Sequence, residues 1–171
     1  MLPLIGNSSC RFVSLLTRQR NQHGGAVALA DDYRTTVEAT WSISVELADA
    51  LIPIGLARPV LQLVSTLDPN GVPLDVVASP AARAAIAGQR ASSVSGGQAA
   101  VEEQDCRDAL RNLHRLNLVS VDPGGGPRAI RTHALVQRAT LEALSADAVS
   151  TAAHAAADAL EIGRASCRER V

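Results

Sequence analysis

Residues 105–144 read DCRDALRNLHRLNLVSVDPGGGPRAIRTHALVQRATLEAL, and this stretch decides the fold. Its first part places the apolar residues Cys106, Leu110, Leu113 and Leu116 three or four positions apart. That spacing puts all four side chains on one face of a helix. The pattern therefore predicts an amphipathic helix that ends shortly after residue 115.

The second part of the stretch predicts a hairpin and then another helix. Leu118–Val121 (LVSV) is typical of a short strand, and Asp122–Pro127 (DPGGGP) is rich in turn-forming residues. Ala129–Arg131 can pair back on the first strand, and a new helix is expected to start around Thr132–His133. The predicted fold class is mainly α: a winged-helix-like helical domain with one short β-hairpin, followed by an extra helix.

Further helices are expected on both sides of this stretch. Thr35 or Thr36 can cap a helix that Ile52-Pro53 closes, and Trp41 should anchor it in the core with its indole N–H bonded locally. The other predicted helices cover Leu56–Leu67, Pro73–Ala78, Pro80 to a stop at Gly88, Ala99–Arg115, and Ser145–Glu161 with a weak stripe of Val149, Ala153, Ala156 and Leu160. Between the third and fourth of these, Gln89–Gln98 is expected to be a flexible loop.

These patterns divide the chain into four parts. Residues 1–32 are poorly patterned and are expected to be a poorly ordered N-terminal segment. Residues 33–144 form the winged-helix-like domain, and residues 145–161 form a further helix. Residues 162–171 break the composition abruptly and resemble a translated sequencing-adaptor tail, so we predict an artefactual or disordered tail.

Composition excludes several kinds of enzyme chemistry. All 16 basic residues are arginine, so the chain has no lysine for a Walker A loop or for a Schiff base. There is no Gly-x-Ser-x-Gly elbow for a nucleophilic serine. The sequence therefore predicts no catalysis by these residues alone.

Charge and hydropathy indicate a cytoplasmic protein that neither enters a membrane nor attracts polyanions. The formal net charge is −1, so no basic excess favours nucleic acid or an anionic membrane surface. The apolar runs are shorter than the roughly 20 residues that span a bilayer. The three cysteines are widely spaced and odd in number, as expected of reduced thiols.

Two candidate ligand sites are weak. Gly124–Gly126 lies between two short β-like runs, whereas a phosphate-binding glycine loop joins a strand to a helix, so a hairpin turn is the better interpretation. Cys106, His114 and His133 invite a metal hypothesis. No two of them have the close spacing of zinc ligands, so we expect no metal site.

A winged helix also suggests DNA binding, for which the helix ending at Arg115 would be the recognition helix. That helix carries Arg107, Arg111 and Arg115 on one face. It also carries the acids Glu102, Glu103, Asp105 and Asp108. Because acids balance the arginines, a solvated helix face is favoured over a groove-reading one, and nucleic acid is an unlikely partner.

His133 is the one residue singled out as a candidate binding group. It lies where the hairpin ends and the next helix begins. The first backbone N–H groups of a helix are free, and the helix dipole favours an anion there. The alternative is a histidine satisfied by local packing.

Four blocks, in order, carry a family resemblance. YRTTVEATWSIS at residues 33–44 looks like a V-x-x-T-W-x-[IL]-S helix, and LVSTLDPNGVP at residues 63–73 like an L-D-P-x-G-[IV]-P segment. ALRNLHRLNLVSV at residues 109–121 and RTHALVQ at residues 131–137 resemble A-L-x-x-L-x-x-x-S-L-V and V-H-x-L-V-Q. Together they resemble the winged-helix region of bacterial, actinomycete-like signal-transduction ATPases of the NB-ARC or STAND type.

The resemblance implies a regulatory winged-helix fragment that closes over ADP bound by a separate nucleotide-binding core and relays nucleotide state. The family's Met-His-Asp motif contacts the ADP diphosphate through its histidine, and that role falls on His133. Thr132-His133-Ala134 lacks the acidic third residue, so only the histidine contact carries over. ADP or ATP would be bound in the parent protein, and the helix at residues 145–161 would open a tetratricopeptide-repeat region.

Two other functions remain open. A DNA-binding winged-helix transcription regulator would share the fold, and a plain helical protein-interaction module would share the composition. In the favoured interpretation the partners are the missing nucleotide-binding core and other proteins, with no membrane.

Overall fold

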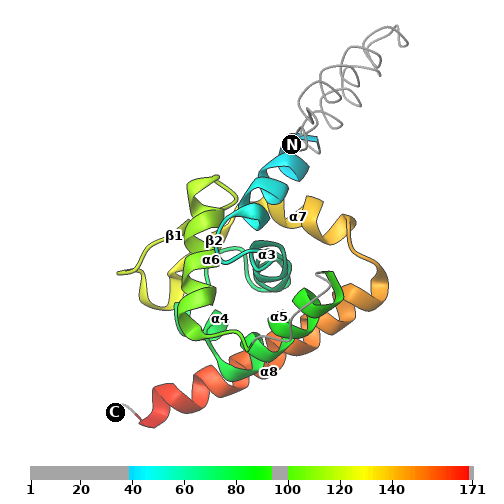
Figure 1. The fold of residues 1–171 in the computed structure, drawn as a ribbon. Coiled ribbons are helices and arrows are strands. Elements are labelled where there is room, and N and C mark those ends of the chain that lie inside the picture. The colour runs from blue at the N-terminus through cyan, green and yellow to red at the C-terminus, as the bar shows by residue number, and fades with distance from the viewer. Residues whose placement is uncertain (1–38, 94–99, 170–171) are drawn as a thin grey trace, which may run out of the picture. The chain divides into compact units, whose positions relative to one another are not determined.

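The computed structural model describes residues 39–93 and 100–169, and α3 (Ala57–Ser65) lies at the centre of the described elements. Figure 1 shows α3 end-on, with α5, α6, α7 and α8 around it. The remaining elements, in chain order, are a helix at residues 39–50, α4 (Leu74–Val77), α5 (Pro80–Ser93), α6 (Glu103–Arg115), β1 (Val119–Val121), η1 (Gly126–Arg128), β2 (Ile130–Thr132), α7 (Ala134–Glu142) and α8 (Ala146–Glu169). This is the predicted mainly α fold with one β-hairpin.

The helix at residues 39–50 packs against the core through one face. Val45 and Ala48 are fully buried, and Trp41 packs against the core. The expected local bond of the indole is not formed: Trp41 Nε1 is buried without a hydrogen-bond partner among the described residues. The helix then ends, and a cis Ile52-Pro53 bond lies in the loop before α3.

The N-terminal end of α3 is capped by a residue of the preceding helix. Leu56 at its N-cap has no side-chain cap bond, and Asp49 Oδ1 instead accepts from the backbone N–H of Arg58 at 2.9 Å. Val60, Leu61 and Val64 are buried, and Leu67 just beyond the helix is buried too. The helix ends at Ser65, slightly before the predicted Leu67, because a tight turn starts there.

That turn docks the chain against the hairpin. Asp68 Oδ1 accepts from the backbone N–H of Asn70 at 2.9 Å, which closes the turn. Val72 then exchanges two backbone hydrogen bonds with Ile130, at 2.8 and 2.9 Å. The order helix, bridge, helices and hairpin gives a helical domain with one β-hairpin.

α5 starts as predicted but ends later. Ser79 Oγ accepts from the N–H of Ala82 at 3.2 Å, so Ser79 caps the helix. The predicted stop at Gly88 is wrong, because α5 continues to Ser93 with Gly88 in its interior. Consequently the first part of the predicted loop, residues 89–93, is helical. Residues 94–98 of that predicted loop lie outside the described residues.

α6 and the hairpin follow the sequence closely. Cys106, Leu110 and Leu113 are buried, and Leu116 packs against the same core. The helix starts at Glu103, later than the predicted Ala99, because Glu102 caps it. β1 and β2 pair antiparallel, with the register Val119↔Thr132, Ser120↔Arg131 and Val121↔Ile130.

α8 packs by a different face from the one predicted. Its buried residues are Ala152, Ala156 and Ala159, whereas Leu160 is 38% exposed. Of the predicted stripe only Ala156 is buried. Alanines allow close approach of helix backbones, and this face lies against α3, α4 and α5.

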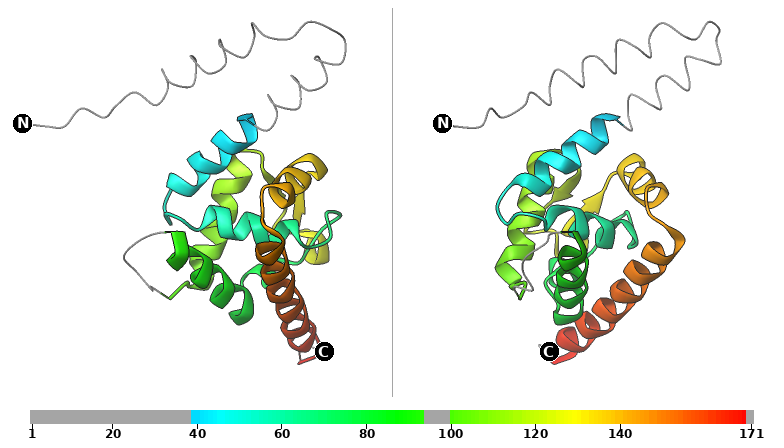
Figure 2. Two further views of the ribbon diagram at one scale, coloured as in Figure 1. Left: turned by 90° about the vertical axis from the view of Figure 1, so that its right-hand side faces the viewer. Right: turned by 45° about the vertical axis from the view of Figure 1, so that its right-hand side comes forward.

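α8 also corrects one predicted boundary. It runs past the predicted end at Glu161 to Glu169, so the backbone of residues 162–169 is helical rather than disordered. It belongs to the same compact unit as the preceding helices, Glu38–Val171. Figure 2 shows it running beside α5, away from α7. The predicted N-terminal segment at residues 1–32 lies outside the described residues.

Candidate functional site: the start of helix α7

His133 forms the start of α7 through both its side chain and its backbone. It is the N-cap residue, with extended backbone (φ −63°, ψ 134°), and its Nδ1 accepts from the backbone N–H of Leu135 at 3.3 Å. Its carbonyl accepts from the N–H of Gln137 at 2.9 Å. The imidazole is exposed, and its contact among the described residues is this local capping bond at Nδ1.

The hydrogen bond at Nδ1 sets the tautomer of His133. A ring nitrogen that accepts an N–H bond carries no proton in the neutral imidazole, so the proton lies on Nε2. No described residue bonds to Nε2 of His133. In this geometry the ring presents a donor to whatever lies in front of α7.

The hairpin brings Arg131 to the same side as His133. Thr132 lies between them and is buried at 5% exposure, while Arg131 and His133 are both exposed. Alternate residues of an extended strand point to the same face. The guanidinium of Arg131 makes no hydrogen bond or ion pair with any described residue, so its charge adds to the positive end of the α7 dipole.

Gln137 ties the start of α7 to the end of α3, and the sequence reasoning did not foresee this. Its Nε2 donates to the carbonyls of Ser65 and Leu67, both at 2.9 Å. In a continuing helix the Ser65 carbonyl would accept from residue 69, which is Pro69 and has no N–H. That missing donor was the signal that another group must serve the carbonyl.

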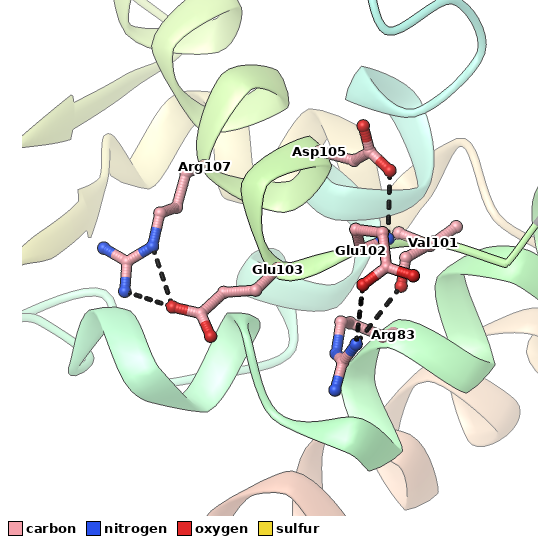
Figure 3. Close-up of polar contacts among 6 residues, drawn as sticks. All are labelled: Arg83, Val101, Glu102, Glu103, Asp105 and Arg107. Carbon is pink, nitrogen blue, oxygen red and sulfur yellow. Dashed lines mark hydrogen bonds and ion pairs between the residues drawn. The ribbon is translucent and has the colours of Figure 1, made fainter.

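Acids of the same helix pair with two of the three arginines on one face of α6, and Figure 3 shows the pair of Arg107 with Glu103. Arg107 bonds Glu103 at 2.6 Å, and this hydrogen bond and charge lower the pKa of the Glu103 carboxyl. Arg111 pairs with Asp108. Only Arg115 of the three predicted arginines has no partner among the described residues. The pairing agrees with a solvated face.

The same figure shows how α6 begins. The Asp105 carboxylate accepts from the Glu102 N–H at 2.9 Å, and the Glu102 side chain accepts from the N–H of Asp105. This reciprocal capping box satisfies two free backbone donors. Arg83 of α5 approaches Glu102 at 3.8 Å and the carbonyl of Val101 at 3.5 Å, which fixes α5 beside the start of α6.

The residues of the metal hypothesis serve separate roles. Cys106 is fully buried, and burial raises the pKa of its thiol to about 11. His114 Nδ1 lies 3.1 Å from the Val119 carbonyl and 3.3 Å from the Val121 nitrogen, so it joins α6 to β1. Within residues 39–93 and 100–169, no three histidine, cysteine or acidic side chains gather as a metal would require.

The glycine run lies in the connection of the hairpin. Asp122 Oδ1 accepts from the N–H of Gly124 at 3.0 Å, and the Asp122 carbonyl accepts from that of Gly125 at 2.9 Å. The run leads into η1 and then β2. The interpretation of this run as a hairpin connection is confirmed.

Exposed apolar side chains gather near the loop before α3. Ile52 is 84% exposed, and Leu47 and Ile54 are each more than half exposed. Asn112 Nδ2 of α6 donates to the Ile52 carbonyl at 3.0 Å and holds the loop in place. The loop is thus fixed by a polar contact while its apolar side chains face outward.

Among the helices that the structure describes, none combines the length and the hydropathy needed to cross a membrane. Comparison of the chain with the known protein families, with curated proteins and with solved structures found no match in any of the three.

Proposed function

We propose that this chain is the regulatory winged-helix lid of a STAND or NB-ARC-type ATPase. It closes over ADP held by a nucleotide-binding core and relays the nucleotide state to protein partners in the cytoplasm. It performs no catalysis itself, because the lysine-bearing Walker A loop is supplied by the core. His133 contacts the ADP diphosphate through Nε2–H. α8 would then lead into a tetratricopeptide-repeat region.

The single observation that supports this role is the arrangement at His133. Its Nδ1 is bonded to the Leu135 N–H, and the ring is exposed at the positive end of a nine-residue helix. A neutral imidazole with its proton on Nε2 can donate to a phosphate oxygen, and a protonated one adds a charge. The free N–H groups of the first turn favour the same ligand.

ADP release from the parent ATPase tests the proposal. A fluorescent ADP is loaded, and its release is followed after excess unlabelled nucleotide is added, for the wild type and for His133→Ala. We expect His133→Ala to release ADP at least roughly tenfold faster, the ratio for loss of one hydrogen bond to a charged group. Arg138→Ala, which removes an ion pair with Glu142 on the exposed surface of α7, is the control and should release ADP at the wild-type rate.

Equal release rates for the wild type and His133→Ala would contradict the proposed contact. The release experiment should be repeated with fluorescent ATP in the presence of Mg²⁺. If the lid reads the nucleotide state, His133→Ala should affect ADP retention more than ATP retention.

A DNA-binding regulator is the second candidate. It is favoured by three exposed arginines whose side chains have no partners among the described residues, namely Arg115, Arg128 and Arg131. A gel shift at low salt separates the two functions, since non-specific DNA binding is strongest there. A shift that disappears in Arg115→Ala would support the regulator. The lid predicts no shift. A plain interaction module, the third candidate, would instead depend on the exposed Ile52 and Ile54.

A further inference from the structure

We infer that Gln137 is the positioning residue of this site: it fixes His133 relative to α3 and couples contact at His133 to the C-terminal end of α3. The inference rests on the proposed function of His133 and names the residue through which that contact reaches the core.

The main chain of Gln137 connects directly to His133. The backbone N–H of Gln137 donates to the His133 carbonyl at 2.9 Å and closes the first turn of α7. The side-chain amide of the same residue donates to the carbonyls of Ser65 and Leu67, both at 2.9 Å. One residue therefore bonds to His133 on one side and to the end of α3 on the other.

The Ser65 carbonyl at the end of α3 and the Leu67 carbonyl just beyond it depend on this amide. The last carbonyls of a helix have no partner within the helix. For Ser65 the next-turn donor would come from Pro69, which has none, and the N–H of Gly71, four residues after Leu67, bonds to the Asp68 carbonyl instead. Each amide of glutamine has two N–H donors, so one Nε2 can serve both carbonyls.

Few side chains of α7 contact the core. Thr140 is its one buried residue, and its hydroxyl bonds within α7, to the Val136 carbonyl at 2.7 Å. Val136 is half-buried and packs against the core, whereas Leu135, the bulky residue next to His133, is 56% exposed. Beside the packing of Val136, the two bonds of Gln137 should therefore determine how the first turn of α7 is placed.

Three variants of the full chain test the inference. Gln137→Met keeps the length of the side chain and removes both donors. Gln137→Glu offers only acceptors to the two carbonyls at neutral pH, but its protonated form regains one O–H donor. Gln104→Met is the control, since the Gln104 amide bonds Asp108 on the exposed surface of α6 at 3.2 Å.

Amide hydrogen exchange is the first measurement. We expect Gln137→Met to speed exchange at Leu135 and Gln137 by about tenfold, which is the ratio for one net hydrogen bond. The amides of β1 and β2 should keep their rates, which excludes global unfolding. Gln104→Met should match the wild type throughout.

The variant Gln137→Glu gives a readout that lost packing would not produce. After correction for intrinsic exchange, its α7 amides should be fast at pH 7 and regain protection as the introduced carboxyl is protonated. Unchanged exchange at Leu135 in Gln137→Met, or no regain of protection in Gln137→Glu at low pH, would overturn the inference.

ADP release then separates this inference from the proposed function. Faster release in both His133→Ala and Gln137→Met, with no further gain in the double variant, supports both. Faster release in His133→Ala alone overturns the positioning role and leaves the proposed function standing. Faster amide exchange in α7 of Gln137→Met, together with unchanged ADP release in both variants, supports the positioning role and contradicts the proposed function.

Discussion

Gly71 occupies the closest approach between the turn after α3 and the hairpin. Its φ is +142°, and a Cβ added there would lie 2.6 Å from the Cβ of Arg128. A backbone at this φ strongly favours glycine. The glycine of the L-D-P-N-G-V-P segment thus has a structural reason, since it lets Val72 reach Ile130.

A matched pair of glycine variants tests this reasoning. Gly71→Ala should lower the free energy of unfolding by about 1–3 kcal/mol, through backbone strain and the contact with Arg128. Gly88→Ala should raise it by roughly 0.5–1 kcal/mol, because Gly88 lies in a helix with open space around its Cα. Urea unfolding measures both, and equal effects of the two variants would contradict the argument.

Cys106 should make the stability fall at alkaline pH. Burial raises its pKa from 9.0 to about 11, so above pH 9 the unfolded chain loses the thiol proton before the folded chain does. The stabilising contribution is therefore complete below pH 9 and is lost as the pH rises through 11. Unfolding curves between pH 8 and 11 should show this fall in the wild type and a smaller one in Cys106→Ala. Parallel curves would contradict it.

At the scale of elements, the helices form where the sequence supplies end signals as well as an apolar stripe. Ser79 and Ser145 cap their helices, and each accepts a hydrogen bond from the N–H three residues on. Gly88 was misread as a stop because a glycine disfavours a helix interior only slightly, and packing outweighs that cost. Stripes of leucine and valine were placed correctly, but an alanine-rich helix such as α8 gives little contrast between its faces.

The corrected face of α8 gives a prediction of its own. Ala156→Leu should destabilise the fold by about 1–3 kcal/mol, because the added atoms have no room against the packed helices. Ala153→Leu, on the exposed side of the same helix, should change the unfolding free energy by less than about 0.5 kcal/mol. Thermal unfolding compares them. A larger loss of stability in Ala153→Leu than in Ala156→Leu would instead support the predicted stripe that contains Ala153.

At the scale of the whole molecule, the sequence predicted the fold class, the hairpin and the position of His133, and it missed what joins them. Apolar spacing and turn residues are local signals, so helices and a hairpin can be read from them. The bonds that Gln137 donates to Ser65, Asn112 to Ile52 and Arg58 to Asp49 depend on which segments meet in space. A residue's own neighbours in the sequence do not reveal such partners.

The chain should therefore depend on α8 for its stability. A chain that ends at residue 144 loses the alanine face that covers α3, α4 and α5, and we expect it to unfold at a much lower urea concentration than the full chain. A chain that ends at residue 161 keeps Ala152, Ala156 and Ala159 and is the control. Equal midpoints for the full chain and the chain ending at 144 would mean that α8 is a separate repeat after all.

The contact between Gln137 and Ser65 also governs when this protein can be completed on the ribosome. The two residues are 72 positions apart, so the first of them leaves the exit tunnel long before the second is translated. Until Gln137 is made, the carbonyls at the C-terminal end of α3 lack their amide donor. That end of the helix therefore stays exposed to solvent, proteases and chaperones in the nascent chain. Pausing translation just before codon 137 should leave nascent chains that a protease cleaves near residues 66–71, and release of the pause should protect them.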